Sequence, residues 1–494
     1  MSMISISKLT FAYEGSHDNV FENVSFHIDT DWKLGLTGRN GRGKTTLLKL
    51  LMGKYEYQGR IAHDVEFEYF PYTVKNTDAF AIDAMKEVAP HVEDWRIFKE
   101  INRLALSDEM LYRPFNTLSY GERSKCLLAA MFLRENSFLL IDEPTNHLDV
   151  EGRMLLSEYL NTKKGFILVS HDRAFLDGCI DHIMAINRAS IDIQKGDFST
   201  WWKNKQEEDA MEKSKNEKLK GDIKRLNAAA KRTERWSEKA EKTKYGSNNS
   251  GLKVDRGYVG HKAAKMMKRS KAIENRQMDL IEEKAQLLKN IEAEEDLKIT
   301  PLPYPSNRII ELRNINLSFG KKKLCKNFNL AIEQGDRTAI CGKNGCGKSS
   351  VLKMILGHIQ PNSGEIIKNG RLKISYVSQN SDCLRGNLST YAAENQIDKT
   401  KFLTILRKLG FTRAQFEKDM NSFSEGQKKK VLIAASLCQS AHLYIWDEPL
   451  NYIDVISRIQ LEELIKKSSM TLLFVEHDYL FLKEIATKKV FLSN

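Results

Sequence analysis

The 494-residue sequence has few of the residues that stabilise small extracellular or zinc-binding domains. It contains seven cysteines, an odd number, and no two of them form a Cys-x-x-Cys pair. No cluster of histidines accompanies them. These absences argue against a disulfide framework and against a structural zinc site. We expect the cysteines to be reduced thiols in the core or at the surface.

Long apolar runs are absent too. No stretch approaches the roughly 18 consecutive apolar residues that a membrane-spanning helix needs. The N-terminal residues 1–11 alternate like a strand and have neither the basic nor the apolar region of a secretory signal. We therefore expect a cytoplasmic protein. The length predicts about three domains, and an apolar content of 41% is enough for sizeable cores.

Positive charge is concentrated in one part of the chain. Between Lys218 and Arg276 there are 18 Lys and Arg against 6 Asp and Glu, an excess of 12 that equals the formal net charge of the whole chain. The remaining residues are therefore close to neutral. An excess confined to 59 residues predicts contact with a polyanion, nucleic acid being the first candidate and a solvated linker the alternative.

The same region has a heptad pattern, which favours helices over a flexible linker. Apolar residues recur every seven positions from Met266 to Leu287, and a shorter apolar stripe lies within residues 219–230. Gly, Ser and Asn are frequent in between and indicate a loop. We predict an antiparallel helical hairpin, the arm, over residues 203–300 with its tip at about 244–258. Helices of roughly 38 residues would each span about 57 Å.

Two copies of one phosphate-binding motif flank the arm, in residues 1–202 (the first half) and 301–494 (the second half). Each copy reads G-x-x-x-x-G-K-[ST], follows a strand-like run and opens a helix-like one, at an offset of 304 residues. Glycines let backbone N–H groups surround a phosphate, the lysine reaches the β and γ phosphates, and the hydroxyl can hold Mg²⁺. The predicted nucleotide-binding residues are Gly38, Asn40, Gly41, Gly43, Lys44, Thr45 and Thr46, and Gly342, Asn344, Gly345, Gly347, Lys348, Ser349 and Ser350.

Each half also has a strand-like run that ends in two carboxylates. An Asp can hold Mg²⁺ through its waters, and a Glu can polarise the attacking water in nucleotide hydrolysis. A histidine follows a further strand-like run in each half, and although one such histidine is more often structural, two at a matching offset of 306 residues predict a shared role. The residues concerned are Asp142, Glu143 and His171 in the first half and Asp447, Glu448 and His477 in the second.

A third repeated element lies between the P-loop and the acidic strand of each half. Ser119 with Gly121, and Ser424 with Gly426, head helix-like runs, so each serine is a predicted N-cap beside free N–H groups that suit an anion. With Asn146-His-Leu-Asp149 and Asn451-Tyr-Ile-Asp454, these elements resemble the signature and D-loop of ATP-binding cassette (ABC) ATPases.

That resemblance implies two cassettes that face head to tail within one chain. Each ATP would lie between one P-loop and the opposite signature. The implied pairs are Lys44 and Thr45 with Ser424 and Gly426, and Lys348 and Ser349 with Ser119 and Gly121. We therefore expect a monomer whose two halves pair intramolecularly.

The resemblance also implies an aromatic ring that stacks on adenine. Tyr13 or Phe11 would supply it in the first half and Phe319 in the second, with core packing as the alternative for each. The implied Mg²⁺ ligands are Thr45, Asp142, Ser349, Gln379 and Asp447.

The sequence departs from the ABC pattern in several places. Tyr72 stands in the first half where Gln379 stands in the second, and Tyr120 and Glu425 replace a usual Gly of the signatures. The second half also departs from the Glu-Pro-Thr-Asn-His-Leu-Asp sequence of the first half. We therefore expect unequal sites and question hydrolysis at the first.

Over its whole length the chain resembles the ABC-F family of translation factors, as an α/β protein of two tandem ABC-type P-loop ATPase domains joined by a long antiparallel helical hairpin. The family implies entry into the tRNA exit site of the ribosome, with the arm directed at the peptidyl tRNA and the peptidyl-transferase centre. The long arm and the motif sequences of the two cassettes resemble those of the Lsa-type antibiotic resistance proteins, which protect bacterial ribosomes from lincosamides, pleuromutilins and streptogramin A. A housekeeping ABC-F factor without drug protection and the ATPase subunit of a membrane transporter are the alternatives.

The arm supplies the predicted RNA contacts. Cations can hold phosphates and tyrosines can stack on bases. The residues expected to do so are Lys231, Arg232, Arg235 and Lys239 in the arm, and Lys244, Tyr245, Lys253, Arg256 and Tyr258 at its tip.

Overall fold

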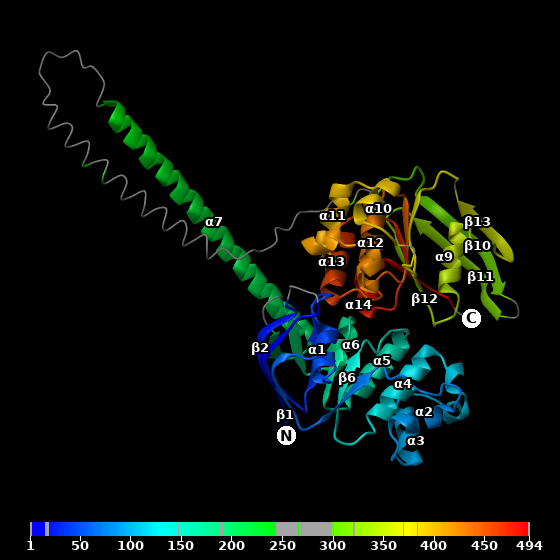
Figure 1. The fold of residues 1–494 in the computed structure, drawn as a ribbon. Helices are drawn as coiled ribbons and strands as arrows, with labels where there is room; N and C mark the ends of the chain where they lie inside the picture. Colours follow the sequence, from blue (N-terminus) through cyan, green and yellow to red (C-terminus); the bar gives the residue numbers. More distant parts are fainter. Residues whose placement is uncertain are drawn as a thin grey trace, which may run out of the picture. The chain divides into compact units, whose positions relative to one another are not determined.

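The computed structural model describes residues 2–14, 19–146, 148–187, 191–243, 265, 268, 299, 301–319, 322–368, 370–382 and 384–492 (Figure 1). The chain divides into two compact units. One combines Met1–Trp201 with Leu297–Asn494 and so contains both halves. The other is Trp202–Asp296.

The first half is built on a six-stranded sheet in the order β5-β6-β7-β3-β8-β9. All neighbouring strands are parallel except the edge pair β8 and β9. The central strands are uninterrupted apolar runs because both faces of the sheet are covered. The strands of this sheet are β3 Lys33–Thr37, β5 Glu66–Phe70, β6 Ser137–Asp142, β7 Phe166–Val169, β8 His182–Ile186 and β9 Ile191–Lys195.

The second half repeats this design with a five-stranded parallel sheet in the order β14-β15-β16-β12-β17. Its strands are β12 Arg337–Cys341, β14 Ile374–Val377, β15 Leu443–Asp447, β16 Leu472–Val475 and β17 Lys488–Phe491. The acidic pairs therefore end β6 and β15, at the carboxyl edge where parallel sheets place their ligand sites. The predicted tandem α/β architecture is confirmed.

A small antiparallel sheet accompanies each large one, in the orders β2-β1-β4 and β11-β10-β13. In β1 the alternation of apolar residues shifts between Ile6 and Leu9, where the register with β2 is irregular and Lys8 has a left-handed φ of 51°. The strands are β1 Met3–Phe11, β2 Phe21–Asp29, β4 Gln58–Ala62, β10 Arg308–Phe319, β11 Lys322–Glu333 and β13 Ser363–Lys368.

Helices follow the strands in both halves. Those of the first half are α1 Lys44–Leu51, α2 Ala81–Val88, α3 Asp94–Arg103, η1 Asp108–Tyr112, η2 Phe115–Thr117, α4 Tyr120–Met131, α5 Val150–Asn161 and α6 Arg173–Cys179. Those of the second half are α9 Lys348–Leu356, α10 Leu388–Glu394, α11 Lys399–Lys408, η3 Arg413–Glu417, η4 Met420–Ser422, α12 Glu425–Cys438, α13 Val455–Lys467 and α14 Tyr479–Ile485.

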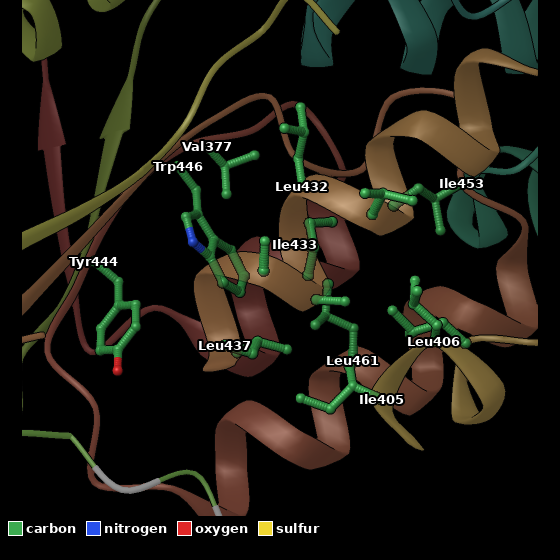
Figure 2. Close-up of a cluster of buried hydrophobic side chains, with 14 of the residues drawn as sticks. Val377, Ile405, Leu406, Leu432, Ile433, Leu437, Tyr444, Trp446, Ile453 and Leu461 are labelled. Carbon is green, nitrogen blue, oxygen red and sulfur yellow. The ribbon is translucent and has the colours of Figure 1, made fainter. Parts of the chain in front are cut away.

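The core of the second half fixes the helix that follows the second signature. Figure 2 shows side chains of α12 packed among residues of β14, β15, α11 and α13, with Trp446 fully buried. Its indole Nε1 donates to Ser436 Oγ at 3.0 Å, so burial leaves no polar atom of the ring unpaired. The residues in view include Val377, Ile405, Leu406, Leu432, Ile433, Leu437, Tyr444, Ile453 and Leu461.

The arm begins with one continuous helix, α7 Phe198–Thr243, of 46 residues. The predicted length of roughly 38 residues per helix, in an arm that begins at residue 203, was therefore too short for this helix. At 1.5 Å per residue the observed helix is about 69 Å long. Its first turn has the buried rings of Phe198 and Trp201, which look from sequence like the end of the preceding half. The predicted tip and the predicted second helix of the hairpin lie outside the described residues, apart from Lys265 and Lys268, which are helical.

Within the described ranges, no helix is both long enough and apolar enough to cross a membrane.

Candidate nucleotide-binding and hydrolytic sites

Each P-loop connects an inner strand of its sheet to a helix, β3 to α1 and β12 to α9. Gly43 and Gly347 are the N-caps of these helices in left-handed conformation, with φ of 89° and 104°. A Cβ on Gly43 would lie 2.6 Å from the Val20 side chain, so glycine is required there for space as well as for φ. The backbone N–H groups that follow are those a phosphate would use.

The P-loop lysines are buried and point back into their loops. Lys44 Nζ donates to Gly38 O at 2.7 Å, and Lys348 Nζ donates to Gly342 O at 2.8 Å. Burial lowers the pKa of Lys44, and Asp454 and Glu143 oppose that shift. Both ammonium groups thus lie inside the loop that would surround the phosphates.

The next residue of each P-loop is joined to the acidic strand. Thr45 Oγ1 donates to Asp142 Oδ2 at 3.0 Å, and Ser349 Oγ donates to Asp447 Oδ1 at 3.1 Å. Burial raises the pKa of both aspartates. A hydroxyl beside a carboxylate is a donor set of the hard oxygen type that Mg²⁺ prefers.

Asp142 has an additional partner that the motifs did not indicate. Tyr69 in β5 donates to Asp142 Oδ2 at 3.0 Å, and burial, followed by the charge of Asp142, raises the pKa of this tyrosine. The corresponding ring of the second half, Tyr376, has its pKa raised to about 12, first by burial and then by Asp447.

The two glutamates share an uncommon backbone conformation. Glu143 and Glu448 have left-handed φ values of 53° and 47°, a conformation that is uncommon for residues other than glycine. Their N–H groups donate to Val169 O at 2.9 Å and Val475 O at 3.0 Å, which ties each turn to the neighbouring strand.

Each glutamate lies beside the predicted histidine. His171 Nε2 is 3.3 Å from Glu143 Oε1, and His477 Nε2 is 3.7 Å from Glu448 Oε1. Burial, with Asp142 adding to it, raises the pKa of Glu143 to about 8. Burial also lowers the pKa of His171 well below its ordinary value and that of His477 to about 3. Neutral imidazoles beside carboxyl groups can relay a proton from an attacking water.

The loops after β5 and β14 differ as the sequence predicts. Gln379 Nε2 donates to Glu448 Oε2 at 2.7 Å, and Asn451 Nδ2 donates to the same oxygen at 2.7 Å. Tyr72 instead donates to Glu87 Oε1 at 3.4 Å. The structure therefore brings Gln379 to the glutamate of the second half and turns Tyr72 toward a different carboxylate.

Of the two aromatic candidates in the first half, Tyr13 is the accessible one. Its side chain is 44% exposed and its hydroxyl lies 2.6 Å from Thr46 Oγ1, whereas Phe11 is only 6% exposed. Phe11 packs edge-on against Tyr13 and so supports it from below. Phe319 lies in β10, and its side chain is outside the described residues.

The predicted serine N-caps are confirmed. Ser119 and Ser424 each form a capping box, with Glu122 and Gln427 respectively.

The structure brings the second signature and D-loop to the first P-loop. Asn40 Nδ2 donates to Tyr452 O at 2.8 Å, and Asn40 N donates to Asp454 Oδ2 at 3.4 Å. A Cβ on Gly426 would lie 2.4 Å from Asn40 Nδ2. This is the pairing that the sandwich of Lys44 and Thr45 with Ser424 and Gly426 requires.

The second P-loop lines a cavity of ≈ 360 Å³ together with Gln379, Glu448, Asn451 and His477, and Leu148 and Arg153 of the first half contribute to its wall. That volume falls in the range of roughly 300–1,000 Å³ typical of ligand sites. Ser119 and Gly121 are not part of this wall, and among described residues a Cβ on Gly121 would contact only Leu148.

The predicted RNA-contacting residues of the arm lie in regions whose side chains are not described. Lys231, Arg232, Arg235 and Lys239 lie in α7, but their side chains are outside the described residues, as is the whole tip with Lys244, Tyr245, Lys253, Arg256 and Tyr258.

Motif reasoning missed two buried charges of the second site, Lys429 and Glu476. Lys429 lies five residues after Ser424, and Glu476 directly precedes His477. The repeat itself contains the signal, because at the offset of the motifs the first half has Ser124 and Ser170 in their places.

Comparisons with known proteins agree with this arrangement. The family model for ABC transporter matches residues 21–146 and 325–451. The ribosome protection protein VmlR of Bacillus subtilis is 30% identical over 98% of the chain and 86% of that protein. The ATP-binding protein Uup of Buchnera aphidicola is 29% identical over 99% of the chain and 80% of that protein.

Solved structures share the fold. An archaeal ribosome recycling factor, aABCE1, crystallised with the ribosomal stalk protein aP1, superposes with a TM-score of 0.62 at 20% identity, covering 98% of the chain and 87% of that protein. The RNase-L inhibitor gives a TM-score of 0.61 at 19% identity with the same coverage.

Proposed function

The chain belongs to the ABC-F family of tandem ABC ATPases and hydrolyses ATP, and from this premise we propose that it is a ribosome-binding protein whose ATP-driven closure sets its residence time on the ribosome. One observation carries the proposal: the similarity to a ribosome protection protein extends over 98% of the chain. The excess of 12 positive charges in residues 218–276 supports it, because such a segment suits the phosphates of rRNA and tRNA. The protein would act in the cytoplasm.

In finer detail, we propose that the protein enters the tRNA exit site and directs its arm at the peptidyl tRNA and the peptidyl-transferase centre. The consequence would be protection from lincosamides, pleuromutilins and streptogramin A. Tip residues 244–258 would act on the drug site directly or by shifting rRNA and tRNA.

The switch would reside in the two sandwiched sites. ATP would bind between each P-loop and the opposite signature, with Mg²⁺ held by Thr45 and Asp142 in one site and by Ser349, Asp447 and Gln379 in the other. When bound, Mg²⁺ neutralises charge on the β and γ phosphates. Glu143 and Glu448 would polarise the attacking waters, and His171 and His477 would assist.

Co-sedimentation with ribosomes tests the switch. The variant with both Glu143→Gln and Glu448→Gln keeps the P-loops and should remain on ribosomes in ATP, while the wild type leaves as it hydrolyses. A double variant that dissociated as fast as the wild type would contradict the proposal. Lys44→Ala with Lys348→Ala is the matched control, since it should prevent the ATP-bound state from forming.

Salt dependence tests the role of the arm. Neutralising Lys231, Arg232, Arg235 and Lys239 together should weaken ribosome binding and reduce the slope of log affinity against log salt, because fewer counterions are released. An unchanged slope would mean that these cations do not contact RNA.

Drug susceptibility tests protection. Cells that express the chain should tolerate higher concentrations of the three drug classes than cells with an empty vector. Deletion of residues 246–254 should remove that tolerance while ATPase activity and ribosome binding persist. Full protection by the deletion variant would contradict a role for the tip.

A housekeeping ABC-F factor is the second candidate, favoured by the match to Uup at 29% identity over 99% of the chain. It predicts ribosome binding with no change in drug tolerance.

A further inference from the structure

The second half buries two ionisable side chains where the first half has hydroxyls. Lys429 is 2% exposed and Glu476 is 4% exposed, and they stand at the positions of Ser124 and Ser170. A third difference accompanies them, since Leu450 replaces Thr145. Burying charges has a large desolvation cost, so their surroundings should show what they hold.

Lys429 holds the loop that contains Gln379. Its ammonium donates to Ser378 O at 2.7 Å, to Gln379 O at 3.0 Å and to Asp447 O at 3.4 Å. One side chain therefore joins α12, the segment after β14 and the end of β15. Carbonyl oxygens partly replace the hydration that the ammonium loses on burial.

Glu476 holds the other side of the site. Its Oε1 accepts from Leu450 N at 2.7 Å and its Oε2 accepts from His477 N at 3.0 Å. The carboxylate thus joins the segment that follows Glu448 to the segment that contains His477.

Both networks converge on Glu448. Gln379 and Asn451 each donate to Glu448 Oε2 at 2.7 Å, and His477 lies 3.7 Å from its Oε1. Lys429 fixes the backbone of Gln379, while Glu476 fixes the backbone of His477 and of the residue before Asn451. All three side chains around Glu448 are therefore anchored by one of the two buried charges.

The charge of Glu476 also stabilises the ionised form of Lys429. Burial lowers the pKa of Lys429 to about 8, and the charge of Glu476 is the strongest of those that oppose the shift. Burial raises the pKa of Glu476 to about 7, a shift that its two backbone hydrogen bonds oppose.

In the first half, hydroxyl groups take the place of one of these anchors. Thr145 Oγ1 lies 3.3 Å from Ser170 Oγ, which accepts from Asp172 N at 3.2 Å. This pairing joins the same two segments as Glu476, but without a charge.

We propose that Lys429 and Glu476 are positioning residues of the second ATP site, which hold Gln379, Asn451 and His477 around Glu448 in the geometry needed for hydrolysis. They act through the backbone and do not contact the nucleotide. The inference rests on ATP hydrolysis by the chain and is independent of its ribosomal partner.

Steady-state ATPase kinetics of the full chain tests this, with Glu143→Gln present throughout so that only the second site turns over. Lys429→Ser and Glu476→Gln should each lower kcat roughly tenfold and leave the KM for ATP within about twofold, as loss of groups that orient a site's ligands does. The double variant should lose little more than either single one, because both act on the same three side chains. Lys428→Ser is the matched control, since that lysine bonds Glu425 at 3.0 Å and should keep kcat.

A triple variant, the transplant, separates a positioning effect from loss of folding. Lys429→Ser, Leu450→Thr and Glu476→Ser together recreate the set that the first half tolerates, and thermal melts establish that the variant is folded at the assay temperature. A tenfold loss of kcat in the folded transplant supports the proposal, even if a single variant fails to fold. A kcat within about twofold of the Lys428→Ser control, in either the transplant or folded Lys429→Ser, overturns it.

Discussion

Glu143 and Glu448 directly follow the equivalent strands β6 and β15 and share a left-handed backbone, yet different groups contact their side chains. Glu448 accepts hydrogen bonds from two amide side chains, Gln379 and Asn451. Among described atoms, Glu143 Oε1 is buried without a hydrogen bond and has His171 nearby at 3.3 Å. The repeat has thus preserved the proposed hydrolytic groups and the turn that contains them, while Tyr72 has replaced the amide that Gln379 supplies in the second half.

The largest effect should come from removing each glutamate in turn. Glu448→Gln is expected to lower steady-state ATPase activity about 100-fold, within the usual contribution of a general base. Glu143→Gln should lower it less than about threefold, because the orienting amide is missing from its site. Equal losses in the two variants would mean that the two sites hydrolyse ATP equally.

Exchanging the divergent residue should have an intermediate effect. With Glu143→Gln present, Gln379→Tyr should lower kcat roughly tenfold, because Glu448 loses a hydrogen bond and the site loses a proposed Mg²⁺ ligand. With Glu448→Gln present, Tyr72→Gln should raise the residual activity a fewfold. If Tyr72→Gln changed nothing, the first site would be limited by something other than the missing amide.

A smaller effect is expected at Tyr69. Tyr69→Phe removes the hydrogen bond to Asp142, which holds the pKa of this carboxyl down against burial. The Mg²⁺ concentration for half-maximal ATP binding at the first site should rise about fivefold, the equivalent of one hydrogen bond of about 1 kcal/mol. Tyr376→Phe is the control, and a similar shift in that variant would argue against a specific contact.

The smallest effect concerns stability against pH. The pKa of Glu143 in the folded chain is about 8 against an ordinary 4.5, so the folded state keeps a proton that the unfolded chain has lost. This contribution to stability is complete below about pH 4.5 and is lost as the pH rises toward 8. The Tm of the wild type should therefore fall further than that of Glu143→Gln between pH 5 and 8. The difference should be about 3 °C for each kcal/mol of stability that is lost.

The control for this measurement is Glu151→Gln, which removes an exposed carboxylate from the same half. If the Tm of wild type and Glu143→Gln changed in parallel with pH, the proton would not be held.

Much of the fold could be predicted from the sequence, because doubled motifs at nearly constant offsets locate strands, loops and helices together. The strands at 166–169 and 472–475 and the caps at Ser119 and Ser424 follow from local rules. Lys429 could not be assigned in this way, since its acceptors are backbone carbonyls at sequence separations of 18 to 51 residues and its chemistry depends on burial. The start of α7 was also missed, because Phe198 and Trp201 read as core residues and helical periodicity does not separate a helix from the core that anchors it.

The left-handed backbone of Glu143 and Glu448 lowers the stability of the protein at two positions that are proposed to serve its activity. A non-glycine residue in that conformation is strained, and at Glu143 the burial of a carboxyl group adds to the cost. Glycine or asparagine would relieve the strain, at the loss of the group that polarises water. A library selected only for resistance to heat should therefore accumulate these replacements at positions 143 and 448, and a library selected for ATP hydrolysis should not.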